Sequence, residues 1–412
     1  MTIELADITS HDTYVDGVPH DTFRYLRAEK PVSWWDEEDG RGFWSVVRHA
    51  DVKVVSHDHE TFSSAQGIRL EDMEPDELES RRTLMEMDPP DHTNLRRLVS
   101  RLFTRGKVGA YEDTIREIAV DIIDRAFAMG EFDFVTEVAR ELPMRMLGRL
   151  MGLPDADGDW LVRMGDQMIA NSDPEFTDHV VDQTDTDEFR LLPFRSPAGL
   201  ELFDYADGLM AERRARPGED LVSKMLEPTK AGEPLPDHEF KNFFALMVAA
   251  GNDTTRYSIA HATKALIDNP GVLAQLQAQP EQFETATEEF LRWATTTMHF
   301  RRTVTRDTEL GGSRLKAGDK LLMWYISANY DEEAFTNPYD LDIAREPNDH
   351  VTFGAGGPHF CLGAWLGRLE VRVALEEIVP RLVGIEQTGP VERLRSNFIN
   401  GIKHLPVKVD LR

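Results

Sequence analysis

The only cysteine of the chain, Cys361, lies in the glycine-rich segment FGAGGPHFCLG of residues 353–363. Apolar residues at helical spacing follow it in AWLGRLEVRVALEEIV. We therefore expect Cys361 at or just before a helix N-terminus, where the helix dipole favours a thiolate over a thiol. A thiolate held there is suited to be an axial ligand of iron. The alternative is a buried cysteine that does no chemistry.

The glycines of the same segment allow tight turns and let a large planar ligand approach the backbone closely. A phosphate-binding loop is a poor interpretation, because GAGG lacks both the GK[ST] ending and the GxGxxG spacing. A single cysteine also excludes an internal disulfide and a zinc site with several thiolates.

A second group of polar residues, AAGNDTTR at 249–256, lies in the middle of a long helical pattern. The pattern begins with Asp237 as N-cap, runs to about Asn269 before Pro270, and predicts a helix of roughly 45 Å. Gly, Asn, Asp and Thr are weak helix formers, so we expect a kink or a widened turn there. Polar residues inside an apolar crossing helix indicate a site, with a hydrogen-bonded structural kink as the alternative.

A third element is the pair Glu289 and Arg292 in EEFLR. Residues three apart lie on one helical face and can form an ion pair. Such a pair also arises by chance in amphipathic helices. The order along the chain is more informative: AGNDTT, then ExxR, then a glycine-rich loop that ends in cysteine.

Helices dominate the elements that must position these residues. Helical spacing predicts helices within 94–103, 114–127 and 200–215, whereas β-branched and apolar runs predict short strands at 43–47 and 320–326. The chain has no repeat and no low-complexity linker, which favours one large domain.

The composition narrows the class of protein. The 412 residues carry a formal net charge of -28, which repels nucleic acid and anionic membranes. The apolar runs are far shorter than the ~20 residues of a membrane span, so we expect no membrane anchor. The opening MTIELADITS lacks a basic leader and an apolar stretch, and we expect a cytoplasmic protein.

From about Tyr14 to the C-terminus the sequence resembles the cytochrome P-450 superfamily, soluble bacterial type. The resemblance is carried by DPPDHTNLRRL, AGNDTTR, EEFLR, RRTVTRDTELGG, ANYDEEAF, NPYDLDIAR and FGAGGPHFCLG. The pattern is most similar to members that oxidise steroid side chains, terpenoids and branched lipids. It implies a mainly α fold with a smaller β region, and a haem b between the long central helix and the helix after the cysteine loop. Residues 1–412 would form a single haem-thiolate monooxygenase domain.

The resemblance also implies roles for individual residues. Cys361 matches the thiolate ligand of the haem iron. The positions that match the partners of the haem propionates are His92, Arg96, Arg302 and His359. One departure is visible, because Phe353 lies eight residues before the cysteine and Gly354 occupies the position seven before it, where many relatives have an aromatic residue. The contact of Phe353 with the thiolate is therefore open.

Two further groups follow from the resemblance. Asp253 and Thr254 match the acid and the alcohol that deliver protons during dioxygen activation. A buried structural network is expected from Glu289, Arg292 and Arg345. The residues expected to line a substrate pocket are Met247, Ala249, Ala250, Met298 and Phe300, within the wall segments 63–87, 168–194, 246–250 and 295–300.

The implied reaction is hydroxylation of a hydrophobic small molecule, a steroid, terpenoid or fatty-acyl lipid, by dioxygen and two electrons. The chain has no flavin or nicotinamide fingerprint, so the electrons would come from an iron-sulfur ferredoxin and its reductase. Residues 92–109 carry five bases and no acid, and would dock an acidic ferredoxin: Arg96, Arg97, Arg101, Arg105 and Lys107. The alternatives are a peroxygenase, a polyketide-tailoring member of the family and a haem-binding protein without turnover.

Overall fold

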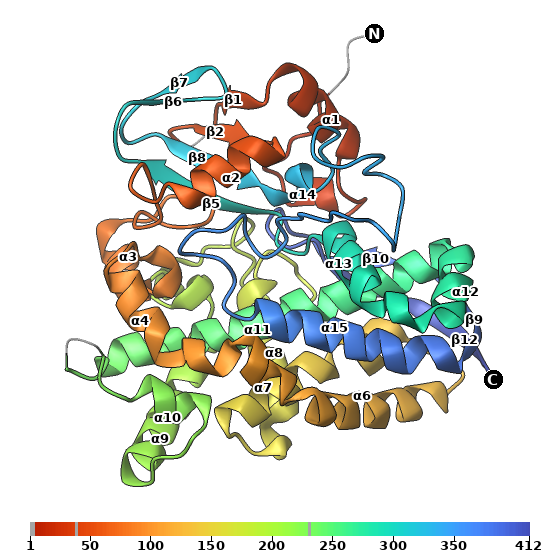
Figure 1. Ribbon diagram of the computed structural model, residues 1–412. Helices are drawn as coiled ribbons and strands as arrows, with labels where there is room; N and C mark the ends of the chain where they lie inside the picture. Colours follow the sequence, from red (N-terminus) through yellow and green to blue (C-terminus); the bar gives the residue numbers. More distant parts are fainter. Residues whose placement is uncertain (1–4, 38–39, 230–231) are drawn as a thin grey trace.

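The computed structural model describes residues 5–37, 40–229 and 232–412. Figure 1 shows a sheet-containing part at the top and a group of long helices below it. The α-helices are α1 (His20–Glu29), α2 (His49–His57), α3 (Pro75–Arg81), α4 (Asp91–Val99), α5 (Arg105–Gly109), α6 (Glu112–Phe127), α7 (Glu141–Met151), α8 (Gly158–Ile169), α9 (Ala198–Ala215), α10 (Leu221–Met225), α11 (Asp237–Asp268), α12 (Pro270–Ala278), α13 (Phe283–Ala294), α14 (Tyr325–Ala328) and α15 (Ala364–Ile378).

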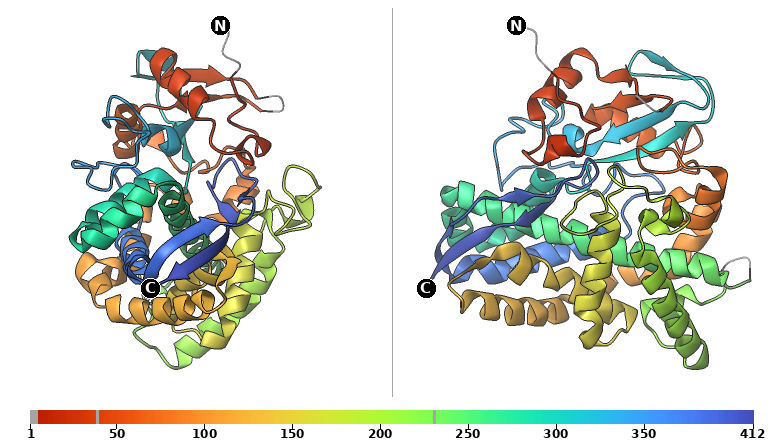
Figure 2. Two further views of the ribbon diagram at one scale, coloured as in Figure 1. Left: turned by 90° about the vertical axis from the view of Figure 1, so that its right-hand side faces the viewer. Right: turned by 180° about the vertical axis from the view of Figure 1, so that it is seen from behind.

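The strands are short. They are β1 (Val32–Trp35), β2 (Phe43–Val46), β3 (Phe62–Ser63), β4 (Glu131–Asp133), β5 (His299–Val304), β6 (Thr308–Leu310), β7 (Ser313–Leu315), β8 (Lys320–Trp324), β9 (Leu382–Gln387), β10 (Glu392–Arg393), β11 (Ile402–His404) and β12 (Pro406–Leu411). The largest sheet has the order β1-β2-β8-β5-β3, with β2 and β8 parallel and the other neighbours antiparallel. A second sheet, β4-β12-β9, lies beside the helices near the C-terminus (Figure 2).

The predicted strands at 43–47 and 320–326 correspond to β2 and β8. Every residue of β8 is buried, because this strand lies inside the sheet with β2 on one side and β5 on the other. The predicted strand at 320–326 extends beyond the C-terminal end of β8, because the backbone turns into α14 at Tyr325. The β5 strand, which adjoins β8, carries two of the residues of the site described below.

The long helix α11 has the bounds that its sequence predicts, to within one residue. It begins after Pro236 and ends at Asp268, and Asp237 is the first helical residue rather than a side-chain cap. Residues 237–268 are α-helical throughout, so the widened turn expected at 249–256 is not present in this range. The Thr254 hydroxyl instead donates to the Ala250 carbonyl at 3.0 Å without interrupting the helix.

The core is built around α11, which packs against α7, α8, α9, α13 and α15. Its aromatic residues Phe240, Phe243 and Phe244 are fully buried. Burial of each such side chain contributes about 1.5–3 kcal/mol to folding. None of the helices in the described parts of the chain is long and apolar enough to cross a membrane.

The cysteine loop leads into α15 as predicted, with Gly363 as the N-cap and Cys361 two residues before it. Gly357 has a φ of 75°, and a Cβ on it would lie 2.1 Å from the carbonyl oxygen of Ser56 in α2. This glycine is therefore required for close packing of the loop against α2, rather than for the approach of a ligand.

Candidate active site

A large internal cavity lies between α11 and the cysteine loop. Its empty volume, which includes space open to solvent, is about 1520 Å³. The wall combines residues from α4, α7, α11, β5, the cysteine loop and α15. Segments far apart in the sequence thus meet at one site.

Cys361 lies on the wall of this cavity. Its backbone N–H donates to the Phe353 carbonyl at 2.8 Å, which fixes the loop behind the sulfur. Burial raises the pKa of the Cys361 thiol, whereas the Gly363 backbone N–H and the Arg96 guanidinium lower it by less. The helix terminus alone therefore does not secure the thiolate, and the anion needs a positive charge in contact with the sulfur.

Two histidines meet at another part of the cavity wall. The rings of His92 and His359 lie 4.3 Å apart, and the His359 Nε2 is 3.1 Å from the Ser64 hydroxyl. Burial lowers the pKa of His92 to about 4 and that of His359 to about 2. His92 is 1% exposed, and neither ring nitrogen has a hydrogen-bond partner among the described residues.

Two arginines supply positive charge beside these histidines. Arg96 donates to the Phe360 carbonyl at 2.6 Å, and Arg302 donates to the Arg301 carbonyl at 2.7 Å. Neither guanidinium forms an ion pair with a carboxylate in the described parts of the chain, although Arg302 is only 4% exposed. A buried guanidinium without a counterion suits an anionic ligand.

The α11 wall of the cavity contains Met247, Ala250, Gly251 and Thr254. Asp253 is not on this wall, because its side chain points toward α8. It forms an ion pair there with Arg256, which also pairs with Asp166. Burial raises the pKa of Asp253 to about 7, and the Arg256 charge opposes this shift.

A network of buried charges lies at the α13 end of the site. Arg292 donates two hydrogen bonds to Glu289, each 2.8 Å long, and Arg345 donates a third at 3.0 Å. Glu289 and Arg292 are fully buried. Arg292 also donates to the carbonyls of Asn329 and Pro338, so it joins α13 to the segment before the cysteine loop.

Comparisons with known proteins identify this arrangement. Residues 198–383 match the family model described as Cytochrome P450. The chain is 38% identical to a steroid C26-monooxygenase of Mycolicibacterium smegmatis over 95% of its own length and 91% of the relative's. It is 37% identical to a methyl-branched lipid omega-hydroxylase of Mycobacterium tuberculosis, with the same coverage. The chain belongs to the cytochrome P450 family.

A solved P450 structure supports the assignment. The Mycobacterium marinum cytochrome P450 CYP268A2 in complex with pseudoionone superposes with a TM-score of 0.89 at 38% identity, covering 99% of this chain and 100% of that one. The mainly α fold with a smaller β region, the monooxygenase class and the haem cofactor expected from the sequence are confirmed.

The residues of the cavity fit a haem. Cys361 offers a sulfur ligand for the iron. Arg96 and Arg302 offer two positive charges for two propionates, and the orphaned ring nitrogens of His92 are hydrogen-bonding groups that the protein leaves incomplete. A buried polar group without a partner is rare in proteins and indicates a ligand that completes it.

Two of the expected pocket residues do not lie on the wall of the cavity in this structure. Met247, Ala250 and Phe300 line the cavity, but Ala249 and Met298 do not. Ala249 is rotated away from Ala250 by one helical step and is 1% exposed in the core. Met298 is fully buried and packs in the cluster that includes Trp324.

Sequence reasoning missed Glu370, a buried carboxyl of α15 that lines the cavity. Burial raises its pKa to about 8, and the nearby Thr255 hydroxyl opposes this shift. The signal was present in the sequence, because Glu370 lies on the same helical face as Leu366 and Val373 and interrupts an apolar stripe. An acid at such a position indicates either a buried partner or a site.

Proposed function

We propose that this P450 hydroxylates a steroid or another hydrophobic lipid at a carbon held above Cys361. The observation that carries the proposal is the set of apolar side chains in the wall of the cavity that contains Cys361. Its members are Leu84, Met85, Phe103, Leu147, Leu246, Met247 and Phe300. Relatives named for steroid and methyl-branched lipid oxidation support the same substrate class.

The protein holds the cofactor and shapes the space beside it. Cys361 would bind the iron, and Arg96, Arg302, His92 and His359 would hold the propionates. The haem, when bound, supplies the activation of dioxygen and the oxidation of a C–H bond. The small side chain of Ala250 leaves room for substrate on the α11 side, whereas the space beside Gly251 is filled by Leu147 of α7.

Thr254 is the residue we propose to hold a proton relay. It lines the cavity, and its hydroxyl is anchored on the Ala250 carbonyl, which leaves oxygen lone pairs free to accept a hydrogen bond from water. The delivery of protons by Asp253 stays a prediction. Its carboxyl has a pKa near neutrality but is held by Arg256 outside the cavity, so delivery would require rotation of this side chain.

An iron-sulfur ferredoxin with its reductase is the electron donor we propose. Arg97, Arg101, Arg105 and Lys107 are exposed, and none forms an ion pair with the described residues. Trp365, which is 40% exposed, lies 5.2 Å from the Arg105 guanidinium. This basic surface with an exposed aromatic residue lies on α4, α5 and the start of α15, the helix that follows the cysteine loop.

The first experiment tests the haem-thiolate site and the substrate class. The reduced carbon monoxide complex of the purified protein should show the red-shifted Soret band of a thiolate-bound haem, and Cys361→Ala should lose it. A panel of sterols, terpenes and fatty acids is then titrated, and the shift from low-spin to high-spin Soret absorption is recorded. The absence of a shift with every member of the panel would contradict the proposal.

A second experiment tests the donor. Charge reversal at Arg97 and Arg101 should raise the ferredoxin concentration needed for half-maximal turnover at low salt, and high salt should reduce the difference. Charge reversal at Arg314, an exposed residue of β7, is the matched control. If the wild-type protein, the variant with reversed charges at Arg97 and Arg101 and the Arg314 control all need the same ferredoxin concentration, the proposed docking site is contradicted.

A further inference from the structure

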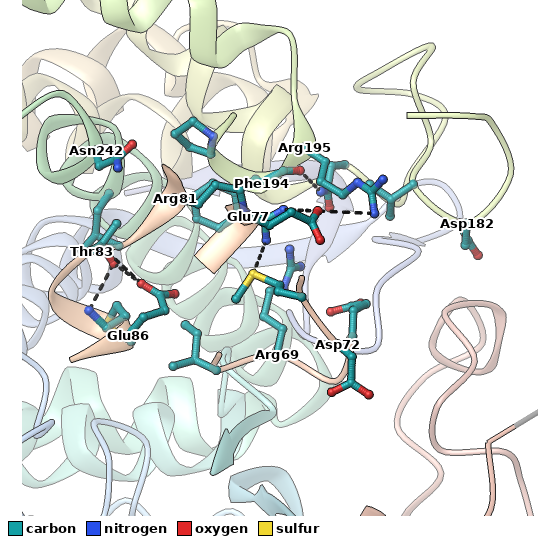
Figure 3. Close-up of a pocket in the computed structure, with 18 of the residues that line it drawn as sticks. Arg69, Asp72, Glu77, Arg81, Thr83, Glu86, Asp182, Phe194, Arg195 and Asn242 are labelled. Atoms are coloured by element: carbon teal, nitrogen blue, oxygen red, sulfur yellow. Dashed lines mark hydrogen bonds and ion pairs between the residues drawn. The ribbon is translucent and has the colours of Figure 1, made fainter. Parts of the chain in front are cut away.

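A second pocket adjoins the cavity above Cys361 (Figure 3). Its empty volume is about 1060 Å³, and it lies between the segments 68–86 and 171–195. Met85 and Leu246 belong to the walls of both spaces. The two spaces are therefore adjacent, with these two side chains between or beside them.

Three guanidinium groups line this pocket: those of Arg69 and Arg81 come from the segment 68–86, and that of Arg195 comes from the segment 171–195 (Figure 3). Arg69 has neither an ion pair nor a side-chain hydrogen bond with the residues that the structure describes. Its guanidinium lies 4.6 Å from the centre of the Phe398 ring and 5.7 Å from that of Phe194. The Nε atoms of Arg69 and Arg195 are both buried without an acceptor in the described parts of the chain.

Arg81 is satisfied only in part. Its Nη2 donates to the Met73 sulfur at 2.7 Å, and a thioether is a weak acceptor. One carboxylate, that of Glu77, lies between two cations, 3.7 Å from Arg81 and 3.9 Å from Arg195. Burial lowers the pKa of Arg81, the carboxylates of Glu77 and Glu86 oppose this shift, and the charges of Arg69 and Arg195 add to it.

Most acids of the wall are engaged by other groups. Asp72 pairs with Arg301 and Lys320, and Asp182 pairs with Arg395. Glu86 accepts hydrogen bonds from Thr83, and burial raises its pKa. Glu71 is the acid whose pKa Arg69 lowers, yet the two do not form an ion pair within 4.0 Å. Arg195 also pairs with Asp187 at 3.7 Å, and Arg81 donates to the Arg190 carbonyl at 3.3 Å. Arg69 is therefore the guanidinium of this pocket that has no ion pair among the described residues.

The backbone of this pocket is strained at the residues that contribute to it. Phe194 and Arg195 have φ values of 57° and 51°, in the left-handed region that residues other than glycine seldom adopt. This conformation places the Phe194 ring near Arg69 and the Arg195 side chain in the pocket. Strain of this kind is typical of ligand-binding positions.

We propose that this pocket binds the carboxylate of an acidic lipid, with Arg69 as its main partner, while the hydrocarbon end reaches the cavity above Cys361. The inference rests on the proposed function and narrows its substrate to a carboxylate-bearing lipid. A charge-assisted hydrogen bond from a planar guanidinium suits a carboxylate best. With the carboxylate fixed there, oxidation occurs at a carbon far from the acid.

The test compares a methyl-branched fatty acid with its methyl ester, by the spin-state shift of the haem-loaded enzyme. The wild-type protein should bind the acid about 10- to 100-fold more tightly than the ester. Arg69→Gln should lose this preference, and Arg69→Lys should keep most of it. Arg314→Gln removes an exposed charge outside both pockets and should keep the preference unchanged.

The outcomes separate this inference from the proposed function. Equal affinity for acid and ester in the wild-type protein, or an unchanged preference in Arg69→Gln, overturns the carboxylate site alone. If neither the two compounds nor any sterol or terpene shifts the spectrum, lipid hydroxylation fails and the inference fails with it. The Soret band of the carbon monoxide complex verifies that each variant holds haem.

Discussion

Two clusters of buried charge in this P450 differ in how their hydrogen bonds are completed. Around Glu289 the protein itself completes the carboxylate, because Arg292, Arg345, the Asn348 amide and the backbone N–H of Asp342 all donate to it. Beside Cys361 and in the adjoining pocket, buried donors and ring nitrogens have no partner among the described residues.

The difference separates residues that hold the fold from residues that hold a ligand. A closed cluster stabilises the chain by itself, and the loss of one member leaves the other charges unpaired. An open cluster costs stability until a ligand completes it, so the loss of one member affects binding more than folding. Substitutions in the two clusters should therefore change different measurements.

The largest effect is expected at Glu289. Glu289→Gln removes the negative charge but keeps the shape, and it leaves Arg292 and Arg345 buried without a counterion. The free energy of unfolding should fall by about 3–5 kcal/mol. The measurement is urea unfolding of the haem-loaded protein, followed by circular dichroism and by the Soret band.

The neighbouring Glu288 is the matched control on the same helix. It pairs with Arg368 and His350 but its side chain is 31% exposed, so water replaces part of what is lost. Glu288→Gln should cost less than half as much as Glu289→Gln. Equal losses for the two variants would show that the closed network has no special role.

The second prediction concerns the open cluster. Arg302→Met removes a buried guanidinium that has no carboxylate partner in the described chain, so unfolding of the haem-free protein should change little. Haem transfer to an acceptor protein should become about 10-fold faster or more, because a charged hydrogen bond to a propionate is lost. Retention of haem at the wild-type rate would contradict the assignment.

Arg301 gives the contrast within one strand. It precedes Arg302 in β5, and successive side chains of a strand point to opposite faces. Arg301 pairs with Asp72 at 2.9 Å outside the cavity. Arg301→Met should therefore lower the stability of the fold and leave haem transfer unchanged.

Local spacing predicts much of this molecule. The apolar pattern between two prolines fixes the bounds of α11, and the three-residue spacing brings Glu289 and Arg292 together on one face. The glycine-rich segment and the helical pattern after it predict the place of Cys361. These features depend on neighbours within a few residues.

What the sequence does not predict depends on the rotation of an element and on partners far along the chain. Ala249 and Ala250 differ by one helical step, and only the packing of α11 decides which of them faces the cavity. Asp253 points away from Thr254 because Asp166 of α8 fixes Arg256 between the two acids. Arg195 of the second pocket lies more than 100 residues along the chain from Arg69 and Arg81, and no shared motif joins them.

The smallest effect is a pH dependence at Glu370, a carboxyl of the open cluster with no cation beside it in the described chain. Its pKa in the folded protein is about 8, above the ordinary value of 4.5, because burial disfavours the charged form. Between these two pH values the folded state keeps a proton that the unfolded state has released. The protonated carboxyl therefore makes its full contribution to the free energy of unfolding below about pH 4.5, and this contribution is lost as the pH rises toward 8.

The side chain of the Glu370→Gln variant cannot ionise, so this variant should not show the decrease in stability with rising pH. From pH 6 to pH 7 the unfolding free energy of the wild-type protein should fall by about 1 kcal/mol relative to the variant. Urea unfolding of both proteins at the two pH values measures the difference. Parallel pH profiles of the two proteins would mean that a cation or a water molecule contacts Glu370. The cluster beside Cys361 would then contain fewer groups without a partner than the structure indicates.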